Sequence, residues 1–369
     1  MKYWRGYLTA AIIAAVTWAL MALGQRFSTL VDMVYPYVIR TLQTILAEWS
    51  GGVDFLLWQL AAVVLLVVLL ATVVLMIVLK WNPIQWFGWV LTGCASIFLL
   101  YTLMFGLNYY ASPLAEDIRM DVSTYNVDEL TEAAIYYRDK ANDLASQVDR
   151  DGQGNVEFSD FATLAQQAGD GFKALTYDYS YSVFAGCTLP VKELGWSDMF
   201  TSMGVTGVTV GITGESAVNP QIPDVSLPFA ICHEMAHRMC IAEERDANFA
   251  GFLASSVNPS VEFQYSAYFM AYRYCYNALA NTNTVSASAA AGRVADGVSS
   301  LLNRDLDAYN RFYSTGSGAY DDVCDLLVNW HIQQVVLPSI TVEEERFDPL
   351  DESQVDLSGI VNARPTEGN

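Results

Sequence analysis

The stretch Cys232-His233-Glu234-Met235-Ala236-His237-Arg238 places two histidines four residues apart, with a glutamate directly after the first. Residues four apart on a helix share one face, so both imidazoles can reach a single metal ion and Glu234 lies beside them. Pro228 suits the first turn of such a helix. The chain has only three histidines, and two fall in this pattern. The stretch predicts a zinc site with His233 and His237 as ligands and Glu234 as the base that activates water.

A catalytic zinc site takes three protein ligands and keeps one position open. After the motif, Glu244 and Asn248 are four residues apart and share a face of the next predicted helix. We expect Glu244 to be the third ligand and Asn248 to accept a hydrogen bond from a ligand imidazole, which fixes the tautomer of that histidine. Glu243 is the alternative ligand. Cys240, three residues after His237, is expected to be a small buried apolar residue.

Three apolar runs near the N-terminus, about residues 7–24, 55–79 and 86–107, are long enough to cross a bilayer as helices. They predict a membrane domain over residues 1–107 with the lipid bilayer as its partner. The first run could instead be a signal peptide, because its flanks are basic and it is short. A retained anchor fits better, since the segment that follows it is amphipathic and no small-x-small cleavage site stands out.

Charge is divided unevenly along the chain. Residues 1–107 hold five basic and three acidic side chains, whereas the whole chain has a formal charge of −21. The region after residue 107 is therefore strongly acidic. Proteins bind nucleic acid through clustered Lys and Arg that contact phosphates, so this charge excludes that function. Lys2, Arg5 and Lys80 flank the spans on one side, and the positive-inside rule puts that side in the cytoplasm. We expect a multi-pass protein of the cell membrane with its large domain outside the cytoplasm.

The region after the spans alternates between helical patterns and one β-rich stretch. Residues 204–219 are dense in Val, Ile, Thr and Gly and predict one or two strands with a turn. Helices are expected at 128–148, 159–175, 243–256, 261–280, 285–312 and 320–336. The predicted fold class is therefore α+β: three N-terminal transmembrane helices, then a mainly helical, zincin-like metallopeptidase domain with a small sheet over residues 108–340. An acidic, disordered tail is expected at 341–369.

A second metal site is predicted in the Asp- and Gly-rich loop between the first two soluble helices. Its spacing resembles an EF-hand calcium loop, with Gly154 at the sixth position. The oxygen ligands for Ca²⁺ would come from Asp149, Asp151, Gln153, Asn155 and Asp160. The twelfth position is Asp instead of the longer Glu, so an ordinary turn between helices is the alternative.

The run His-Glu-Met-Ala-His followed by Glu-Arg-Asp-Ala-Asn-Phe resembles a bacterial membrane-protein family called domain of unknown function 3810, which is grouped with gluzincin peptidases. The resemblance extends to Gly106–Tyr109 and Thr213–Ala217 and covers roughly residues 1–335. It implies a zinc-peptidase-like site with His233, His237 and Glu244 as ligands and Glu234 as base. The family usually has Gly where this chain has Cys240.

A zinc hydrolase of this kind also needs a group that stabilises the oxyanion. His331, the only other histidine, is one candidate, although it lies within a predicted apolar helix. Tyrosines on the predicted helix 261–280 are the alternatives: Tyr265, Tyr268 and Tyr272. A peptide substrate could add to the edge of the 204–219 strands through main-chain hydrogen bonds.

Three functions compete for this sequence. The first is a membrane-anchored zinc metallopeptidase that cleaves peptides or proteins outside the cytoplasm. The second is a non-catalytic, zinc-containing receptor or assembly protein that kept the peptidase scaffold. The third, intramembrane proteolysis, ranks last because His233 lies far beyond the last span. We favour the first because Glu234, which a non-catalytic protein would be free to lose, is present.

Overall fold

The structure is a computed structural model that describes residues 2–313 and 323–338, and the expected tail at 341–369 lies outside them. The described residues are mostly helical with one three-stranded sheet. The N-terminal helices are α1 (Arg5–Arg26), α2 (Ser28–Val34), α3 (Arg40–Ser50), α4 (Leu57–Val78) and α5 (Pro83–Met104). The remaining elements are α6 (Leu114–Asp117), α7 (Val127–Ala145), α8 (Phe161–Tyr177), β1 (Lys192–Glu193), α9 (Ser197–Ser202), β2 (Gly207–Val210), β3 (Glu215–Val218), α10 (Leu227–Arg238), α11 (Glu244–Ser256), α12 (Val261–Asn281), α13 (Val285–Asp296), α14 (Ser300–Phe312) and α15 (Cys324–His331).

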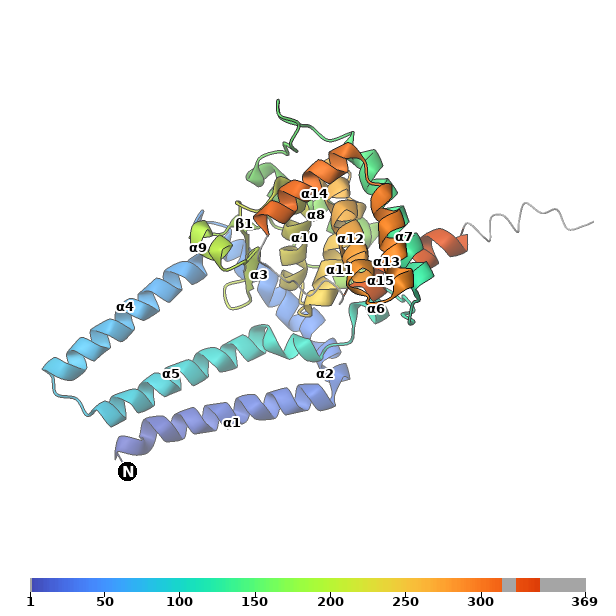
Figure 1. The fold of residues 1–369 in the computed structure, drawn as a ribbon. Coiled ribbons are helices and arrows are strands. Elements are labelled where there is room, and N and C mark those ends of the chain that lie inside the picture. The colour runs from blue at the N-terminus through green and yellow to red at the C-terminus, as the bar shows by residue number, and fades with distance from the viewer. Residues whose placement is uncertain (1, 314–322, 339–369) are drawn as a thin grey trace, which may run out of the picture.

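Three helices, α1, α4 and α5, are long and apolar enough to cross a membrane. Each has 22 residues, which at about 1.5 Å per residue gives about 33 Å. They match the predicted spans to within a few residues. Gly6 and Gly88 let α1 and α5 approach closely, because a Cβ at Gly6 would lie 2.5 Å from the backbone of Gly88. Figure 1 shows all three helices extending from one side of the helical domain, with α4 diverging from α5.

The segment between α1 and α4 is not among the helices that are long and apolar enough to cross a membrane. It forms α2, a π-helical turn (Tyr35–Ile39) and α3, which lie between the ends of the long helices and the large domain (Figure 1). Tyr35 donates a hydrogen bond to the carbonyl of Thr102 near the end of α5 (3.0 Å), and Gln43 donates to the carbonyl of Met104 (2.9 Å). The amphipathic segment thereby joins the last membrane helix to the domain above it.

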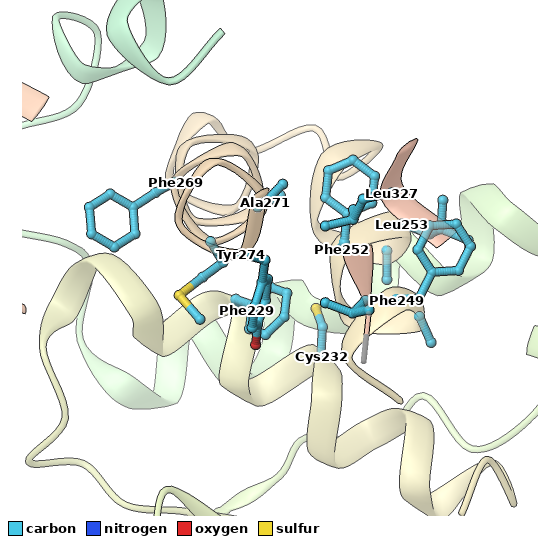
Figure 2. Packing of buried hydrophobic residues seen from close by; sticks show 14 of the residues in the cluster. Phe229, Cys232, Phe249, Phe252, Leu253, Phe269, Ala271, Tyr274 and Leu327 are labelled. Carbon is cyan, nitrogen blue, oxygen red and sulfur yellow. The ribbon is translucent and has the colours of Figure 1, made fainter. Parts of the chain in front are cut away.

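The core of the large domain is the packing of α7, α8, α10, α11, α12 and α15. Figure 2 shows part of it: Phe229 of α10 lies beside Tyr274 of α12, and Phe249 and Phe252 of α11 belong to the same cluster. The predicted single helix at 285–312 is two helices, because α13 ends at Asp296 and the Ser299 side chain caps α14 at the Leu302 N–H (3.2 Å). Such a core fixes the motif helix on three sides.

The sheet has the order β1-β3-β2, with β1 parallel and β2 antiparallel to β3. Val208 of β2 pairs with Ala217 of β3. The β2–β3 turn includes Gly214 at φ +66°, a backbone conformation that only glycine adopts without strain. The strands expected at 204–219 are therefore a hairpin, and it packs against α10.

Polar contacts attach the sheet to the beginning of α4. The Glu215 side chain, fully buried, accepts hydrogen bonds from the backbone N–H groups of Leu57 (2.9 Å) and Trp58 (3.0 Å). A carboxylate at a helix N-terminus satisfies donors that have no partner within the helix and complements the helix dipole. Lys192 of β1 forms an ion pair with Glu215 at 2.8 Å, and Gln59 donates to the carbonyl of Gly195. These contacts attach the large domain to the N-terminal end of α4.

Candidate metal centre

The motif helix α10 ends in a tight turn that sends the chain back over it. The Cys240 N–H donates to the carbonyl of His237 (3.0 Å), and the Ile241 N–H donates to the carbonyl of Ala236 (3.1 Å). These paired bonds define a Schellman cap. Cys240 has φ +67°, the left-handed conformation that glycine adopts most easily. Glycine would therefore carry less strain than cysteine at this position.

Cys240 is held in this conformation by contacts with the amphipathic segment. Its thiol is buried, as expected, in a small cluster with Val31, Tyr35 and Ile39. The Arg40 Nε–H donates to the carbonyl of Met239 at 3.1 Å, which satisfies a carbonyl at the helix end. A left-handed non-glycine residue costs about 1–2 kcal/mol, and this packing offsets that cost.

After the turn, α11 packs closely across α10. A Cβ added at Gly251 would lie 3.3 Å from the backbone nitrogen of His233, so glycine permits the two helices to approach at the metal ligand. Glu244 is the first residue of α11, where the positive end of the helix dipole favours a carboxylate. This crossing brings Glu244 next to both histidines.

The three predicted ligands meet in space. Glu244 Oε2 lies 3.3 Å from His233 Nε2, and Glu244 Oε1 lies 3.5 Å from His237 Nε2. Each of the three residues offers one potential ligand atom, and these atoms all lie within 4.8 Å of one another. Among the described residues, this is the cluster of side chains that could hold a metal ion. Two imidazole nitrogens and one carboxylate oxygen are a donor set that zinc accepts in catalytic sites. The residues therefore fit a single zinc ion.

Hydrogen bonding sets the tautomer of His237. Its Nδ1 lies 2.8 Å from the carbonyl oxygen of Ile241. Because a carbonyl can only accept, Nδ1 carries a proton, so Nε2 is the nitrogen that faces Glu244 and would bind a metal ion. The Nδ1 of His233 is buried with no hydrogen-bond partner among the described residues. The Schellman turn thus positions one metal ligand directly.

The site differs from expectation at Asn248. Neither imidazole donates to it: the Oδ1 of Asn248 instead accepts a hydrogen bond from the hydroxyl of Tyr274 at 3.2 Å. Asn248 nevertheless lines the same cavity as His233 and Glu244. Its position on the metal-facing side of α11 follows from the four-residue spacing, but its partner is a tyrosine of α12.

Electrostatics couple the three side chains. Burial lowers the pKa of His237, but the hydrogen bond that its imidazole donates to Glu244, together with the charges of Glu234 and Glu244, outweighs burial and leaves that pKa above its ordinary value. Hydrogen bonds from His233 and His237 hold the pKa of Glu244 far below its usual range. Glu244 is consequently ionised and ready to bind a cation.

Glu234 lies against the edge strand of the sheet. Its side chain is buried, and its Oε2 accepts a hydrogen bond from the hydroxyl of Thr209 at 2.7 Å. A Cβ at Gly207 would lie 2.4 Å from Oε1, so the strand leaves room for the carboxylate only because Gly207 has no side chain. Sequence reasoning did not identify Thr209 or Gly207 as positioning residues. The available signal was a predicted strand rich in Thr and Gly shortly before the motif helix.

A cavity of about 160 Å³ adjoins the metal ligands. Its lining includes His233, Glu244 and Asn248 together with three tyrosines: Tyr274, Tyr309 and Tyr313. Phe105, the residue after the last membrane helix, approaches from another direction, with its ring centroid 6.0 Å from that of His237. None of these aromatic residues was identified from the sequence.

The candidates for an oxyanion partner lie elsewhere. The ring of His331 packs at 4.8 Å from that of Tyr136, and burial lowers its pKa. Tyr265 donates to the carboxylate of Asp305. Tyr268 and Tyr272 make edge-on or tilted ring contacts with Tyr136 and Tyr276, and neither they nor His331 line the cavity beside the predicted ligands. The structure does not bring these four residues to the site, whereas Tyr274 of the same helix reaches it.

The predicted calcium loop is engaged in local hydrogen bonds. The Asp151 carboxylate accepts from the backbone N–H groups of Gln153 and Asn155 (both 2.8 Å), and Asp160 caps α8 by accepting from the Thr163 N–H (2.9 Å). Such contacts are typical of an ordinary turn between two helices, which was the alternative to a calcium loop. The carboxylates of Asp149, Asp151 and Asp160 do not form a ligand cluster in the described part of the chain, and calcium binding stays a prediction.

Comparison with known proteins identifies the family. The model of a family described as "Protein of unknown function (DUF3810)" matches residues 31–330, so the chain belongs to this family. The resemblance noted from the motif is thereby confirmed at the level of the family. No curated protein and no solved structure matches the chain.

Proposed function

We propose that this protein is a membrane-anchored zinc metallopeptidase that hydrolyses peptide bonds. The observation that carries the proposal is the convergence of His233, His237 and Glu244 on one point, with Glu234 close enough for its charge to raise the pKa of His237. A helix with two metal-ligating histidines and an acidic neighbour is the arrangement that zinc peptidases use.

Each residue has a defined task in this proposal. His233 and His237 present Nε2 atoms and Glu244 presents a carboxylate, which leaves one coordination position for water or substrate. Zinc bound there supplies a Lewis acid that lowers the pKa of water and polarises the scissile carbonyl. Glu234 accepts the proton of the attacking water and later returns it to the leaving amine. Thr209 keeps the Glu234 carboxylate oriented during both steps.

The proposal includes a topology. Figure 1 shows the N-terminus and the α4–α5 connection at the ends of the long helices that are remote from the large domain. Arg5 and Lys80 lie there, and the positive-inside rule puts these ends in the cytoplasm. The metal centre then lies outside the cytoplasm.

Peptide cleavage by the full chain, purified in detergent with zinc, tests the proposal. A degenerate peptide library is incubated with wild type, with Glu234→Gln and with Glu132→Gln, which makes the same change at an exposed residue of α7. We expect Glu234→Gln to bind one zinc and to lose about 10²–10⁴-fold in kcat, as removal of a general base does, whereas Glu132→Gln keeps full activity.

Two results would contradict the proposal. Undiminished cleavage by Glu234→Gln would show that Glu234 is not the general base. A protein that binds zinc at the three ligands but cleaves no peptide would favour the non-catalytic receptor or assembly protein.

A further inference from the structure

Strand β2 offers a free edge beside the metal centre. In the described residues, β2 is hydrogen-bonded to β3 on one side only and is the last strand of the sheet. Its four residues run past the Glu234 carboxylate, which touches Gly207 and Thr209. An extended peptide can add to such an edge through main-chain hydrogen bonds, which would place its backbone next to the base and the metal ligands.

The other end of β2 abuts the last membrane helix. A Cβ added at Gly211, the residue after β2, would lie 3.0 Å from the carbonyl oxygen of Met104 and 3.3 Å from the Cβ of Phe105. Met104 is the last residue of α5, whose 22 residues match the thickness of a bilayer core. The chain after Val210 therefore lies at the level where α5 leaves the membrane.

The metal centre lies at the same level. Phe105 directly follows α5, and its ring centroid is 6.0 Å from that of His237. The buried Glu215 carboxylate holds the sheet on the first residues of α4. Contacts with α4 and α5 thus fix the distance between the site and the ends of these two helices.

We propose, on the basis of the peptidase function above, that the substrate is a membrane-anchored polypeptide, bound through the extended segment that directly follows its own membrane span. Strand residues advance about 3.3 Å each, so the four residues of β2 cover about 13 Å. A substrate strand along this edge has one end at the bilayer surface, and its scissile bond lies within the roughly four residues that run along β2. Bonds inside the bilayer are excluded, because the ligands lie beyond the end of α5.

The experiment uses the full chain, loaded with zinc, in liposomes. One peptide sequence, chosen from those cleaved in detergent, is presented in three forms: free in solution, joined to a membrane-spanning helix by a spacer of about 4 residues, and joined by a spacer of about 25 residues. The long-spacer form is the matched control, because it shares the increase in local concentration that any tether gives.

We expect the short-spacer form to be cleaved with a kcat/KM at least about tenfold above that of the long-spacer form, because only its extended segment is in register with β2. Equal cleavage of the two tethered forms would overturn the assigned substrate class and leave the peptidase function intact.

Binding to Glu234→Gln protein separates the two proposals. This variant keeps the metal ligands, and energy transfer from labelled peptides reports binding without cutting. Tighter binding of the short-spacer form supports the assigned substrate class even if wild type cleaves nothing, in which case only the peptidase function fails. Equal binding of both tethered forms would contradict the substrate class.

Discussion

Two adjacent glutamates, Glu243 and Glu244, show how the turn after the motif selects a ligand. Glu243 is the N-cap residue of α11 and stays outside the cluster, whereas Glu244 faces both imidazoles. We predict that Glu244→Gln weakens zinc binding by at least about 100-fold, since even partners of the ligands contribute 10–100-fold. Glu243→Gln, the matched control, should change it by less than about threefold.

Competition with a chelating dye measures both zinc affinities. Equal losses in the two variants would mean that the zinc does not bind through Glu244, and a larger loss in Glu243→Gln would restore the alternative ligand.

The pKa values of His237 and Glu244 predict a pH dependence for the zinc-free protein. The pKa of His237 is raised, so its contribution to stability is complete below the unfolded value of about 6.5 and is lost as pH rises through the folded value. The pKa of Glu244 is lowered, so its contribution is present above about 4.3 and is lost as pH falls. The pair stabilises the zinc-free fold most between these limits.

Thermal unfolding of chelator-treated protein from pH 4 to 8 tests this dependence. The difference in Tm between wild type and Glu244→Gln should be largest near about pH 5–6. With zinc bound the trend should reverse, because the metal replaces a proton on His237 and binds more tightly as pH rises. A difference that does not vary with pH would contradict the coupling of the two side chains.

At the scale of elements, the sequence predicted the motif helix and the next helix but not the turn between them. Spacing placed Glu244 and Asn248 on one face because helical periodicity is local. The left-handed Cys240 depends instead on contacts with residues 31–40, about 200 positions away in the chain. For the same reason, the pattern of α12 could not show that Tyr274, and not Tyr265, Tyr268 or Tyr272, faces the site.

The contact between β3 and α4 carries a prediction of its own. Glu215→Gln leaves Lys192 without its ion pair and weakens the cap on α4. Breaking a buried pair from one side costs about 3–5 kcal/mol, so we expect loss of protection from hydrogen exchange at the amides of Leu57 and Trp58. Glu193→Gln, at the exposed neighbouring position of β1, is the control.

Hydrogen exchange followed by mass spectrometry on the full chain measures this protection. Unchanged protection in Glu215→Gln, or equal loss in both variants, would show that the carboxylate does not hold the domain on the membrane helix.

At the scale of the whole molecule, the three long apolar helices, the mostly helical fold with a small sheet and the family were predictable from the sequence. Long uncharged runs identify membrane helices without any tertiary information. The position of the candidate metal site close to the end of α5 was not predictable, because it rests on contacts between distant residues such as Leu57 with Glu215 and Phe105 with His237. The sequence suggested a remote domain, since His233 lies more than a hundred residues after the last span. In the structure, the candidate site instead lies close to the end of α5, where Phe105 contacts His237.

The zinc centre is the central claim, and X-ray absorption at the zinc edge, with metal analysis of the full chain, tests it most directly. We predict one zinc per chain, with nitrogen and oxygen ligands at about 2.0–2.2 Å that include two imidazoles. Zinc content should fall toward zero in the double variant His233→Ala, His237→Ala. A chain that binds no zinc, or a spectrum with sulfur ligands at about 2.3 Å, would contradict the account.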